Sequence, residues 1–334
     1  MPRKARIDAP GAIHHIICRG IEGQNVFWDE TDRIDLLQRL EKILIETSTP
    51  CYAWALLPNH FHLLLRTGNA PIATVMLRLL SGYAGRFNRR HRRSGHLFQN
   101  RYKSILCQEN KYLLELVRYI HLNPLRAGVV ASLNQLDYYA YCGHAILMGL
   151  RKCDWQEMDF VLNLFGKRVW AARRAYHAFI EKGISHGNRP ELVGGGLLRS
   201  MGGWKAIKSL RNSQIHLKGD ERILGDSNFV DSVLKTQNEQ MERRYKLQAQ
   251  GWDFEKVVSR VAEIFNMEAS LILTAGKQTL RVKSRSLVCF WAVKELKMKA
   301  TEVAKLLDIT QSAVTKAVIR GEKLVLENKW KLIK

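Results

Sequence analysis

The chain of 334 residues has no apolar run of the length needed to cross a bilayer, and none of its six cysteines forms a Cys-x-x-Cys pair. Its start, MPRKARIDAPGAIHH, is basic but lacks the apolar core of a secretory signal. Two glycine-containing stretches, at residues 191–204 and 274–279, lack the spacing of a phosphate-binding loop and are interpreted as turns. These absences favour a soluble intracellular protein with reduced cysteines and no zinc ribbon.

Acidic residues are scarce, and between Thr47 and Gln108 there are none. The whole chain has 53 Lys and Arg residues against 31 Asp and Glu, a formal net charge of +22. Such an excess predicts a polyanionic partner, either nucleic acid or an acidic membrane surface. Inside the window without acids, residues 86–104 interleave Phe87, Phe98 and Tyr102 with seven basic residues. Aromatic rings among arginines favour single-stranded nucleic acid, bound by backbone neutralisation and base stacking, over a solvated basic face.

Hydrophobic periodicity in the first 150 residues predicts the element order β-α-β-β-α-β-α. Strands are expected at residues 11–20, 51–57, 60–66 and 96–107, and helices at residues 29–46, 70–90 and 109–122. The first helix is expected to bury a stripe made of Ile34, Leu37, Leu40 and Leu44. The order is typical of a split βαβ unit, so we predict an α+β fold with a ferredoxin-like antiparallel sheet.

Three domains are expected, at residues 1–150, 151–251 and 252–334. The middle one is a connector of mixed helical and glycine-rich character with no assigned role. The last one is mostly helical, and its segment KATEVAKLLDITQSAVTKAVIRG contains two short apolar-periodic stretches joined at LDITQS. This pattern predicts a helix-turn-helix whose second helix begins at Thr310 or Gln311, although any small helical bundle has the same spacing. Basic residues within 277–285 favour DNA binding.

The stretch LLPNHFHLLLR places two histidines in an otherwise apolar strand. Alternate side chains of a strand share a face, so His60 and His62 lie side by side while Phe61 and Leu63 point away. A pair of imidazoles on an apolar strand favours a shared partner, either a metal ion or a phosphate. The competing interpretation is a structural pair of histidines that binds no metal.

The segment KYLLELVRYIHLNPLRAG is expected to be a helix on which Tyr119 and Asn123, four positions apart, share a face. If that face meets the histidine strand, His60, His62 and Asn123 would hold a divalent cation that polarises a phosphodiester. Tyr119 would then attack phosphorus and form a covalent phosphotyrosine.

Each of these assignments has a competitor in the same segment. Asn123 directly precedes Pro124, so it is also a candidate N-cap of a new helix that begins with proline. The Tyr119 ring could pack at the helix edge with its hydroxyl in water, and Tyr112 lies on nearly the same face. His121 and His96 are expected to contact DNA or to lie at the surface.

These residues resemble a known class of enzymes. PNHFHLLL resembles the His-hydrophobic-His motif of the HUH nucleases, and RYIHLNPLRAG resembles the tyrosine segment of single-tyrosine HUH transposases, which contain an IS200-like transposase domain. The likeness is greatest to the REP-associated tyrosine transposases and covers residues 1 to about 150. It implies a transposase that cleaves and rejoins single-stranded DNA with Mg²⁺ or Mn²⁺ through a 5′-phosphotyrosine. His60 and His62 then match the metal histidines, Tyr119 the nucleophile and Asn123 the third ligand.

The resemblance also implies partners. Members of the family commonly recognise imperfect DNA hairpins, and the residues expected to contact single-stranded DNA are Arg19, Arg86, Arg89, Arg90, Arg92, Arg93, Arg101 and Lys103. The last domain resembles the DNA-binding domain of the replication initiator DnaA and the Trp-repressor-like fold, but lacks the Asp-His-Thr-Thr recognition segment. Its residues expected to contact duplex DNA are Arg285, Gln311, Ser312, Thr315 and Lys316.

Two other functions and the oligomeric state stay open. A catalytically inactive DNA-binding regulator would keep the same fold, and a charged ferredoxin-like sheet also suits RNA binding or cleavage. The protein could act as a monomer or as a homodimer. The expected location is the bacterial cytoplasm, in association with the nucleoid, with no membrane partner.

Overall fold

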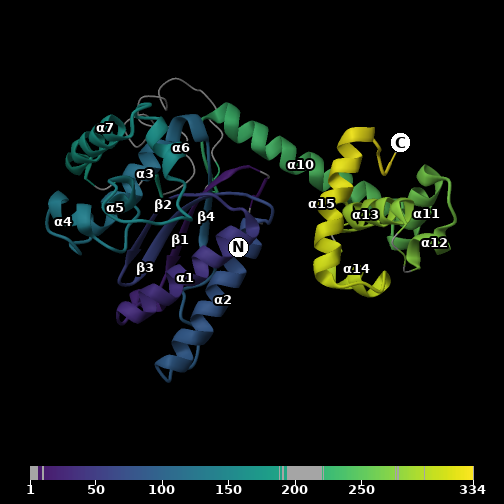
Figure 1. The fold of residues 1–334 in the computed structure, drawn as a ribbon, viewed down its shortest axis with the longest axis horizontal. Coiled ribbons are helices and arrows are strands. Elements are labelled where there is room, and N and C mark those ends of the chain that lie inside the picture. The colour runs from purple at the N-terminus through teal and green to yellow at the C-terminus, as the bar shows by residue number, and fades with distance from the viewer. Residues whose placement is uncertain are drawn as a thin grey trace, which may run out of the picture. The chain divides into compact units, whose positions relative to one another are not determined.

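The computed structural model describes residues 7–9, 11–187, 189, 192–193, 220, 222–274, 276, 278–296 and 298–333. The chain divides into two compact units, Met1–Val233 (unit 1) and Leu234–Lys334 (unit 2) (Figure 1). The division into three domains stays a prediction. The turns predicted at residues 191–204 lie outside the described residues apart from Leu192 and Val193, and so do positions 275 and 277 of the second glycine-containing stretch.

Unit 1 is an α+β structure, as predicted. Its main elements are β1 (Ile13–Arg19), α1 (Glu30–Thr47), β2 (Cys51–Leu57), β3 (His60–Arg66), α2 (Ile72–Arg90), β4 (Lys103–Cys107), α3 (Glu109–Arg126), α4 (Leu133–Tyr138), α5 (His144–Leu147), α6 (Met158–Asn163), α7 (Val169–Lys182) and β5 (Ile223–Leu224). The sheet order is β2-β3-β1-β4-β5, with antiparallel pairing except between β4 and β5. The first four strands have the order of a split βαβ sheet, so the predicted element order is confirmed.

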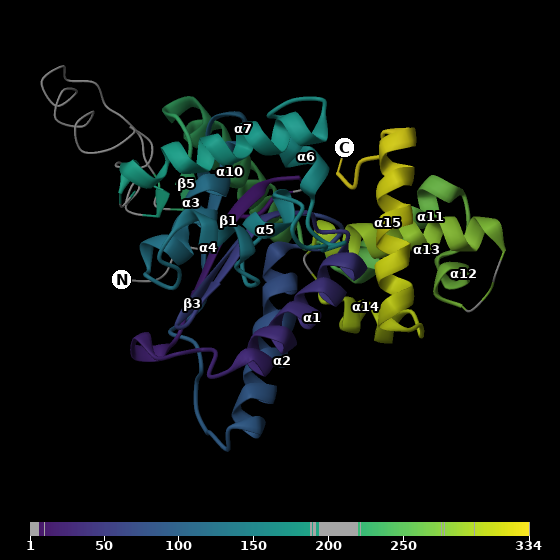
Figure 2. The same cartoon turned by 60° about the vertical axis from the view of Figure 1, so that its left-hand side comes forward.

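Side chains alternate across the sheet, so each strand contributes to two separate apolar cores. Ile16, Phe61 and Leu63 point to one face, which α1 and α2 cover. Ile13 and Leu64 point to the other face, where α3 packs together with α4, α6 and α7 (Figure 2). Because His60 and His62 alternate with Phe61 and Leu63, they lie on the face that α3 covers.

Two predicted elements differ in detail. In α1 the buried stripe is made of Leu36, Leu40, Ile43 and Leu44, whereas Ile34 is exposed, so the predicted stripe was wrong by part of a turn. The strand predicted at 96–107 is shorter, because Asn100 has a φ value of 57°. Such left-handed backbone cannot continue a strand, and β4 therefore begins only at Lys103.

Helix α3 is longer than predicted and positions the candidate nucleophile. It begins at Glu109, which forms an ion pair with Arg66, and it continues through Pro124 to Arg126. Asn123 therefore lies inside the helix, and the alternative in which it caps a new helix is excluded. Since α3 follows β4, it runs in the direction of β1, from the Arg66 end of the sheet toward the end that carries His60.

Unit 2 is helical. Its elements are most of α10 (Ser227–Ala249), which begins in unit 1, then α11 (Phe254–Phe265), α12 (Ala269–Leu273), α13 (Thr279–Lys294), α14 (Ala300–Leu306) and α15 (Gln311–Asn328). A short turn joins α14 to α15, and the Thr310 side chain caps α15 by accepting a hydrogen bond from the Ala313 amide. The predicted start of this helix is confirmed. Among the described residues of the whole chain, every helix is too short or too polar to span a bilayer.

The crossing of α13 and α15 depends on Gly321. A Cβ atom at this position would lie 2.1 Å from the Ser286 carbonyl oxygen and 2.6 Å from the Phe290 Cβ. We expect Gly321→Ala to lower the free energy of unfolding of unit 2 by about 1–3 kcal/mol, as overpacked cores do. Urea titration of the full chain followed by circular dichroism measures this change.

The matched control is Gly85→Ala, in α2. A Cβ at Gly85 meets nothing within 4 Å, so this change is expected to leave stability unchanged or raise it by up to about 1 kcal/mol through helix propensity. Equal effects of the two substitutions would contradict the close crossing at Gly321.

Candidate catalytic centre and nucleic-acid interface

The two predicted histidines stand next to each other on β3. The ring centroids of His60 and His62 are 5.1 Å apart, with the ring planes inclined at 73°. The Asn59 Oδ1 atom lies 2.6 Å from His60 Nδ1. Because a carboxamide oxygen only accepts hydrogen bonds, His60 Nδ1 donates, and His60 Nε2 retains its lone pair.

Both imidazoles are uncharged near neutral pH. Burial, with a smaller contribution from the Arg19 guanidinium, lowers the pKa of His60 from 6.5 to about 4. Burial, followed by the neighbouring His15 and His60, lowers the pKa of His62 well below its ordinary value. The neutral imidazole is the form that binds metal ions through nitrogen.

A third imidazole, which the sequence interpretation missed, completes this cluster. His15 of β1 is fully buried, and its Nε2 atom lies 2.9 Å from His62 Nδ1. The two rings stack with centroids 5.2 Å apart and planes inclined at 25°. The strands that carry them pair with His15 opposite Leu64 and Ile17 opposite His62, so the histidines meet across a diagonal of the sheet.

Helix α3 brings Tyr119 to these histidines. The Tyr119 ring is buried and meets His15 and His62 edge-on, with centroid distances of 5.9 and 5.8 Å. The Arg126 guanidinium carbon, two helical turns later, lies 5.5 Å from the centroid of the Tyr119 ring. Arg126 was not predicted, although its place seven positions after Tyr119 on the same helix puts both side chains on one face.

Asn123 follows Tyr119 by one helical turn, in the direction of the sheet end that carries His60. Its side chain is buried, and its Nδ2 atom has no hydrogen-bond partner among the described residues. A buried N–H donor without a protein partner is unfavourable, so Nδ2 suits an acceptor supplied from outside the chain, such as a phosphate oxygen. Among the described residues, no group of three or more His, Cys, Asp or Glu side chains is placed to hold a metal. Two imidazoles and the carboxamide oxygen of Asn123 therefore form the candidate metal-ligand set.

Arg19 and Lys103 lie at the same end of the sheet. Arg19 is exposed and pairs in register with His60, and Lys103 pairs with Ile17. Alternation puts both side chains on the face that α3 covers. The Arg19 charge acts on His60, whereas Lys103 Nζ donates to the Val193 carbonyl oxygen.

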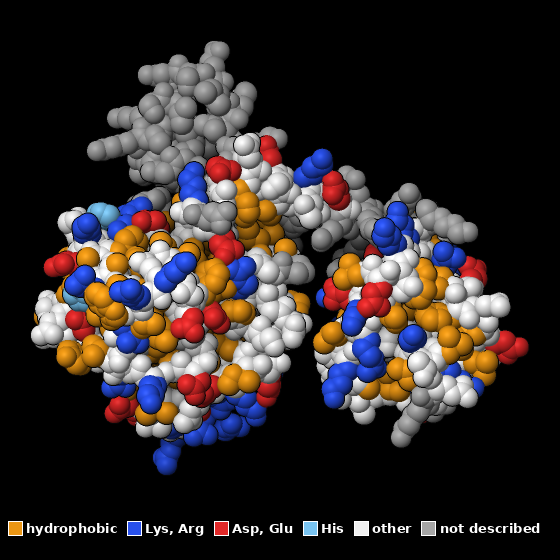
Figure 3. Space-filling model, turned by 45° about the horizontal axis from the view of Figure 1, so that its top comes forward, with side chains coloured by type: hydrophobic (Ala, Val, Ile, Leu, Met, Phe, Trp, Pro, Cys, Tyr) orange, Lys and Arg blue, Asp and Glu red, His pale blue; other side chains and the backbone are white. Residues whose placement is uncertain are grey.

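The other arginines of the basic segment differ in their surroundings. Arg86 forms an ion pair with Asp35, and Arg90 with Asp29 and Asp32, so α1 neutralises part of this segment. Arg93 stacks over Phe87. The remaining three, Arg89, Arg92 and Arg101, are exposed, and they form no ion pair with any described residue. Lys and Arg side chains form a dense group on one edge of unit 1 in the view of Figure 3.

The three aromatic rings predicted to stack on bases lie in or against the core instead of on the surface. Phe87 and Tyr102 are buried in the core beneath α1 and α2, and Phe98 packs against it, so Phe87 and Tyr102 cannot stack on bases. An exposed ring next to this segment is Trp28, which is 55% exposed and lies with its centroid 4.4 Å from that of His91. Its position just before α1 places it beside the basic end of α2.

His121 is a further correction, because it is fully buried rather than at the surface. Its Nδ1 atom lies 2.7 Å from the Tyr176 hydroxyl, which lies equally close to His144 Nδ1. On the other side of the His144 ring, Asp137 Oδ1 lies 2.7 Å from His144 Nε2. This chain of polar contacts ties α3 to α7 and has a structural role. His96 is exposed, in line with the prediction.

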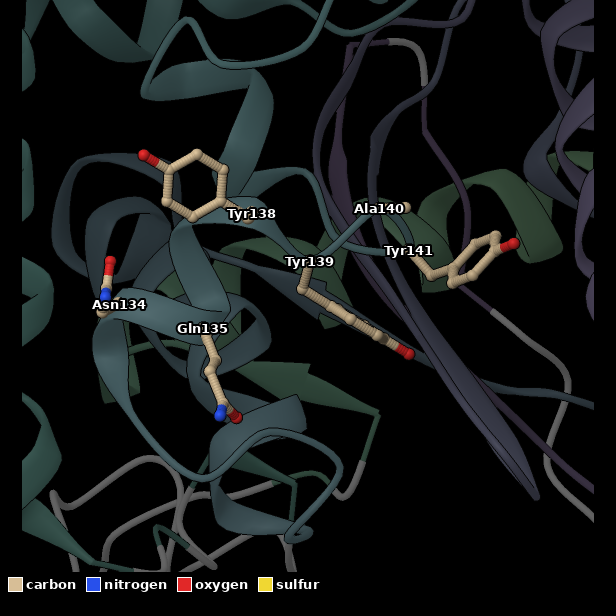
Figure 4. Close-up of a pocket in the computed structure, with 6 residues that line it drawn as sticks. All are labelled: Asn134, Gln135, Tyr138, Tyr139, Ala140 and Tyr141. Carbon is tan, nitrogen blue, oxygen red and sulfur yellow. The ribbon is translucent and has the colours of Figure 1, made fainter.

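A shallow pocket of about 410 Å³ lies at the outer edge of β2. Asn134, Gln135, Ala140 and three tyrosines, Tyr138, Tyr139 and Tyr141, line it (Figure 4). The Tyr139 hydroxyl donates to the Leu56 carbonyl, and the Tyr141 hydroxyl donates to Glu30. None of the predicted site residues lines this pocket.

The residues of unit 2 that were expected to contact duplex DNA fall into two groups. Gln311, Ser312, Thr315 and Lys316 are exposed on the first turns of α15. The Arg285 guanidinium instead bonds to the Gly276 and Arg281 carbonyl oxygens. These N–H donors of Arg285 are therefore engaged inside unit 2.

Comparisons with known proteins find a family match for residues 10–123. The family model described as "Transposase IS200 like" matches residues 10–123, a range that ends at Asn123. A solved structure described as "Structure of the REP associates tyrosine transposase bound to a REP hairpin" is 17% identical, with a TM-score of 0.37 over 46% of this chain and 91% of the other. No curated protein matches the chain. Residues 10–123, which contain the three clustered histidines and Tyr119, therefore match an IS200-like transposase domain.

Proposed function

We propose that this protein is a DNA transposase that cleaves and rejoins single-stranded DNA at hairpin sites through a covalent 5′-phosphotyrosine on Tyr119. One observation carries the proposal: the Tyr119 ring packs edge-on against the cluster that contains His15, His60 and His62. The family match at residues 10–123 supports a transposase role.

His60, His62 and Asn123 would hold a divalent cation, Mg²⁺ or Mn²⁺. The fit rests on two neutral imidazoles that lie next to each other and on the carboxamide oxygen of the buried Asn123 side chain. When bound, the cation polarises the phosphodiester and balances its negative charge.

The chain's own residues carry the transfer. The Tyr119 oxygen attacks phosphorus and gives up its proton to solvent. The bond to the 3′-oxygen breaks, and this oxygen takes up a proton from solvent and leaves as a 3′-hydroxyl. Arg126 places a positive charge beside the reacting phenol ring, and Arg19 and Lys103 neutralise adjacent phosphates. Because the phosphotyrosine linkage is itself a phosphodiester, attack on it by a 3′-hydroxyl rejoins a strand without ATP.

The exposed surface around Trp28 is the proposed contact for unpaired bases. Aromatic rings stack on any base, and Arg89 and Arg92 supply charge for the backbone nearby. We expect Trp28→Ala to weaken single-stranded DNA binding by about 1–3 kcal/mol, the usual contribution of one stacked base. Fluorescence anisotropy with a labelled oligonucleotide measures it.

Trp170→Ala is the matched control for this measurement. Trp170 is 60% exposed on α7, where Arg174 stacks over its ring. Its loss is expected to leave DNA affinity unchanged. Equal losses in the two variants would remove Trp28 from the interface.

Unit 2 is proposed to bind duplex DNA through the exposed start of α15. Gln311, Ser312, Thr315 and Lys316 present two amide or charged side chains and two hydroxyls on the first turns of that helix. Such groups read base edges and contact phosphates in the major groove. Unit 2 would tether the nuclease to the DNA that contains its hairpin.

The function is tested with labelled hairpins drawn from the DNA that flanks the gene. Single-stranded DNA, RNA of the same sequence and blunt duplex are incubated with Mn²⁺ or with EDTA. We expect a protein–DNA adduct that survives a denaturing gel, forms on single-stranded DNA only and needs the metal. Hairpin binding without an adduct under any metal would favour the inactive regulator, and RNA cleavage without an adduct would favour the RNA enzyme.

A further inference from the structure

His15 is the one member of the histidine cluster to which neither the motif nor the proposed reaction gives a task. It is buried on β1, bonded to His62 and in edge contact with Tyr119. Its neighbour His14, on the opposite face of the same strand, instead faces Asp8 and Ser104. Packing alone does not require an imidazole at position 15, because an apolar side chain would fill the same space.

The hydrogen bond between His15 and His62 has two possible directions. A neutral imidazole carries one N–H donor and one nitrogen acceptor. If His15 Nε2 donates, His62 accepts at Nδ1 and carries its proton on Nε2, which leaves no lone pair for a metal. If His62 Nδ1 donates, its Nε2 is free to bind a cation.

The arrangement of the adjacent ligand favours the second direction. His60 donates from Nδ1 to the Asn59 oxygen at 2.6 Å, which leaves Nε2 free. His62 is bonded through the same atom, Nδ1, to His15 at 2.9 Å. The two histidines of the pair are thus held in the same way, each through Nδ1 by a neighbouring side chain. Partners of this kind fix the tautomer and the orientation of metal-binding histidines.

We propose that His15 is a positioning residue that accepts a hydrogen bond from His62 Nδ1 and thereby keeps His62 Nε2 available for a divalent cation. This inference rests on the proposed function. The stacking at 25° and the Tyr119 edge hold the His15 ring in place, so its acceptor stays directed at His62.

The test reads the tautomer directly, in the metal-free protein. Long-range ¹H–¹⁵N correlation spectra of the full chain, labelled at histidine, distinguish Nδ1–H from Nε2–H, and a His62→Gln variant assigns the signal. We expect the Nδ1–H form of His62 in the wild type and in His15→Gln, whose amide oxygen can accept the same bond. In His15→Leu we expect that form to lose its dominance.

The second readout is Mn²⁺ affinity, measured by calorimetry without DNA. We expect His15→Leu to weaken it by about 10–100-fold, as loss of a partner of a ligating histidine does, and His15→Gln to restore most of it. The matched control is His14→Leu, which buries the same apolar side chain in the same strand on the opposite face. It should change neither the tautomer nor the affinity.

Wild-type His62 protonated on Nε2, or a His15→Leu protein that binds Mn²⁺ like the wild type, would overturn the role of His15. If the leucine variant does not fold, the wild-type tautomer and the glutamine variant still decide. If the wild type forms the covalent adduct and His15→Leu still binds Mn²⁺ normally, the role of His15 is refuted and the proposed function is not. A wild type that neither binds Mn²⁺ nor forms an adduct would refute the proposed function as well.

Discussion

Replacing Tyr119 by Phe is expected to abolish the covalent protein–DNA adduct and to lower strand cleavage by more than about 10³-fold, since no other group takes over the attack. The substitution removes one hydroxyl and keeps the ring that packs against His15 and His62. The fold and the hairpin affinity should therefore change little. The adduct is measured on a denaturing gel, and hairpin affinity by anisotropy.

Tyr112→Phe is the matched control on the same helix. Tyr112 lies two turns before Tyr119 and is partly buried against the core on the α3 face of the sheet. Because α3 begins at the Arg66 end of the sheet, Tyr112 lies away from the end that carries His60. We expect this variant to form the adduct like the wild type. An adduct that persists in Tyr119→Phe and disappears in Tyr112→Phe would move the nucleophile to Tyr112.

Local periodicity explains what could be predicted from the sequence. The strand alternation places His60 and His62 on one face, and helical spacing places Tyr119 one turn before Asn123. Both relations join residues a few positions apart, so neither needs the tertiary structure. The hairpin between β2 and β3 and the start of α15 were predictable for the same reason.

Relations across the sheet were not predictable. His15 and His62 are 47 positions apart, and only the register of β1 with β3 brings them together. Likewise, only the packing of α1 on α2 pairs Arg90 with Asp29. The prediction of stacking rings failed because it counted aromatics along the sequence, whereas helix and strand geometry turn Phe87 and Tyr102 into the core. Residues that act through a partner distant in sequence are thus the ones missed.

Removing His62 is expected to have the second-largest effect on cleavage. In His62→Ala we expect Mn²⁺ affinity and Mn²⁺-dependent cleavage to fall by at least about 100-fold, since even partners of metal ligands contribute up to that factor. Hairpin binding in EDTA should persist, because Arg89, Arg92 and Trp28 lie elsewhere on unit 1. Calorimetry, the adduct gel and anisotropy measure the three quantities separately.

His96→Ala is the control for this loss, because it also removes one imidazole but from an exposed loop position. It should leave metal affinity and cleavage unchanged. If His62→Ala binds no metal yet still forms the adduct in EDTA, the Tyr119 reaction proceeds without a cation and the histidines have a structural role. If both variants keep Mn²⁺ binding, the cation lies outside the cluster of His15, His60 and His62. If His62→Ala loses metal binding and cleavage while His96→Ala keeps both, the neutral imidazoles, the buried Asn123 amide and Tyr119 form one catalytic centre.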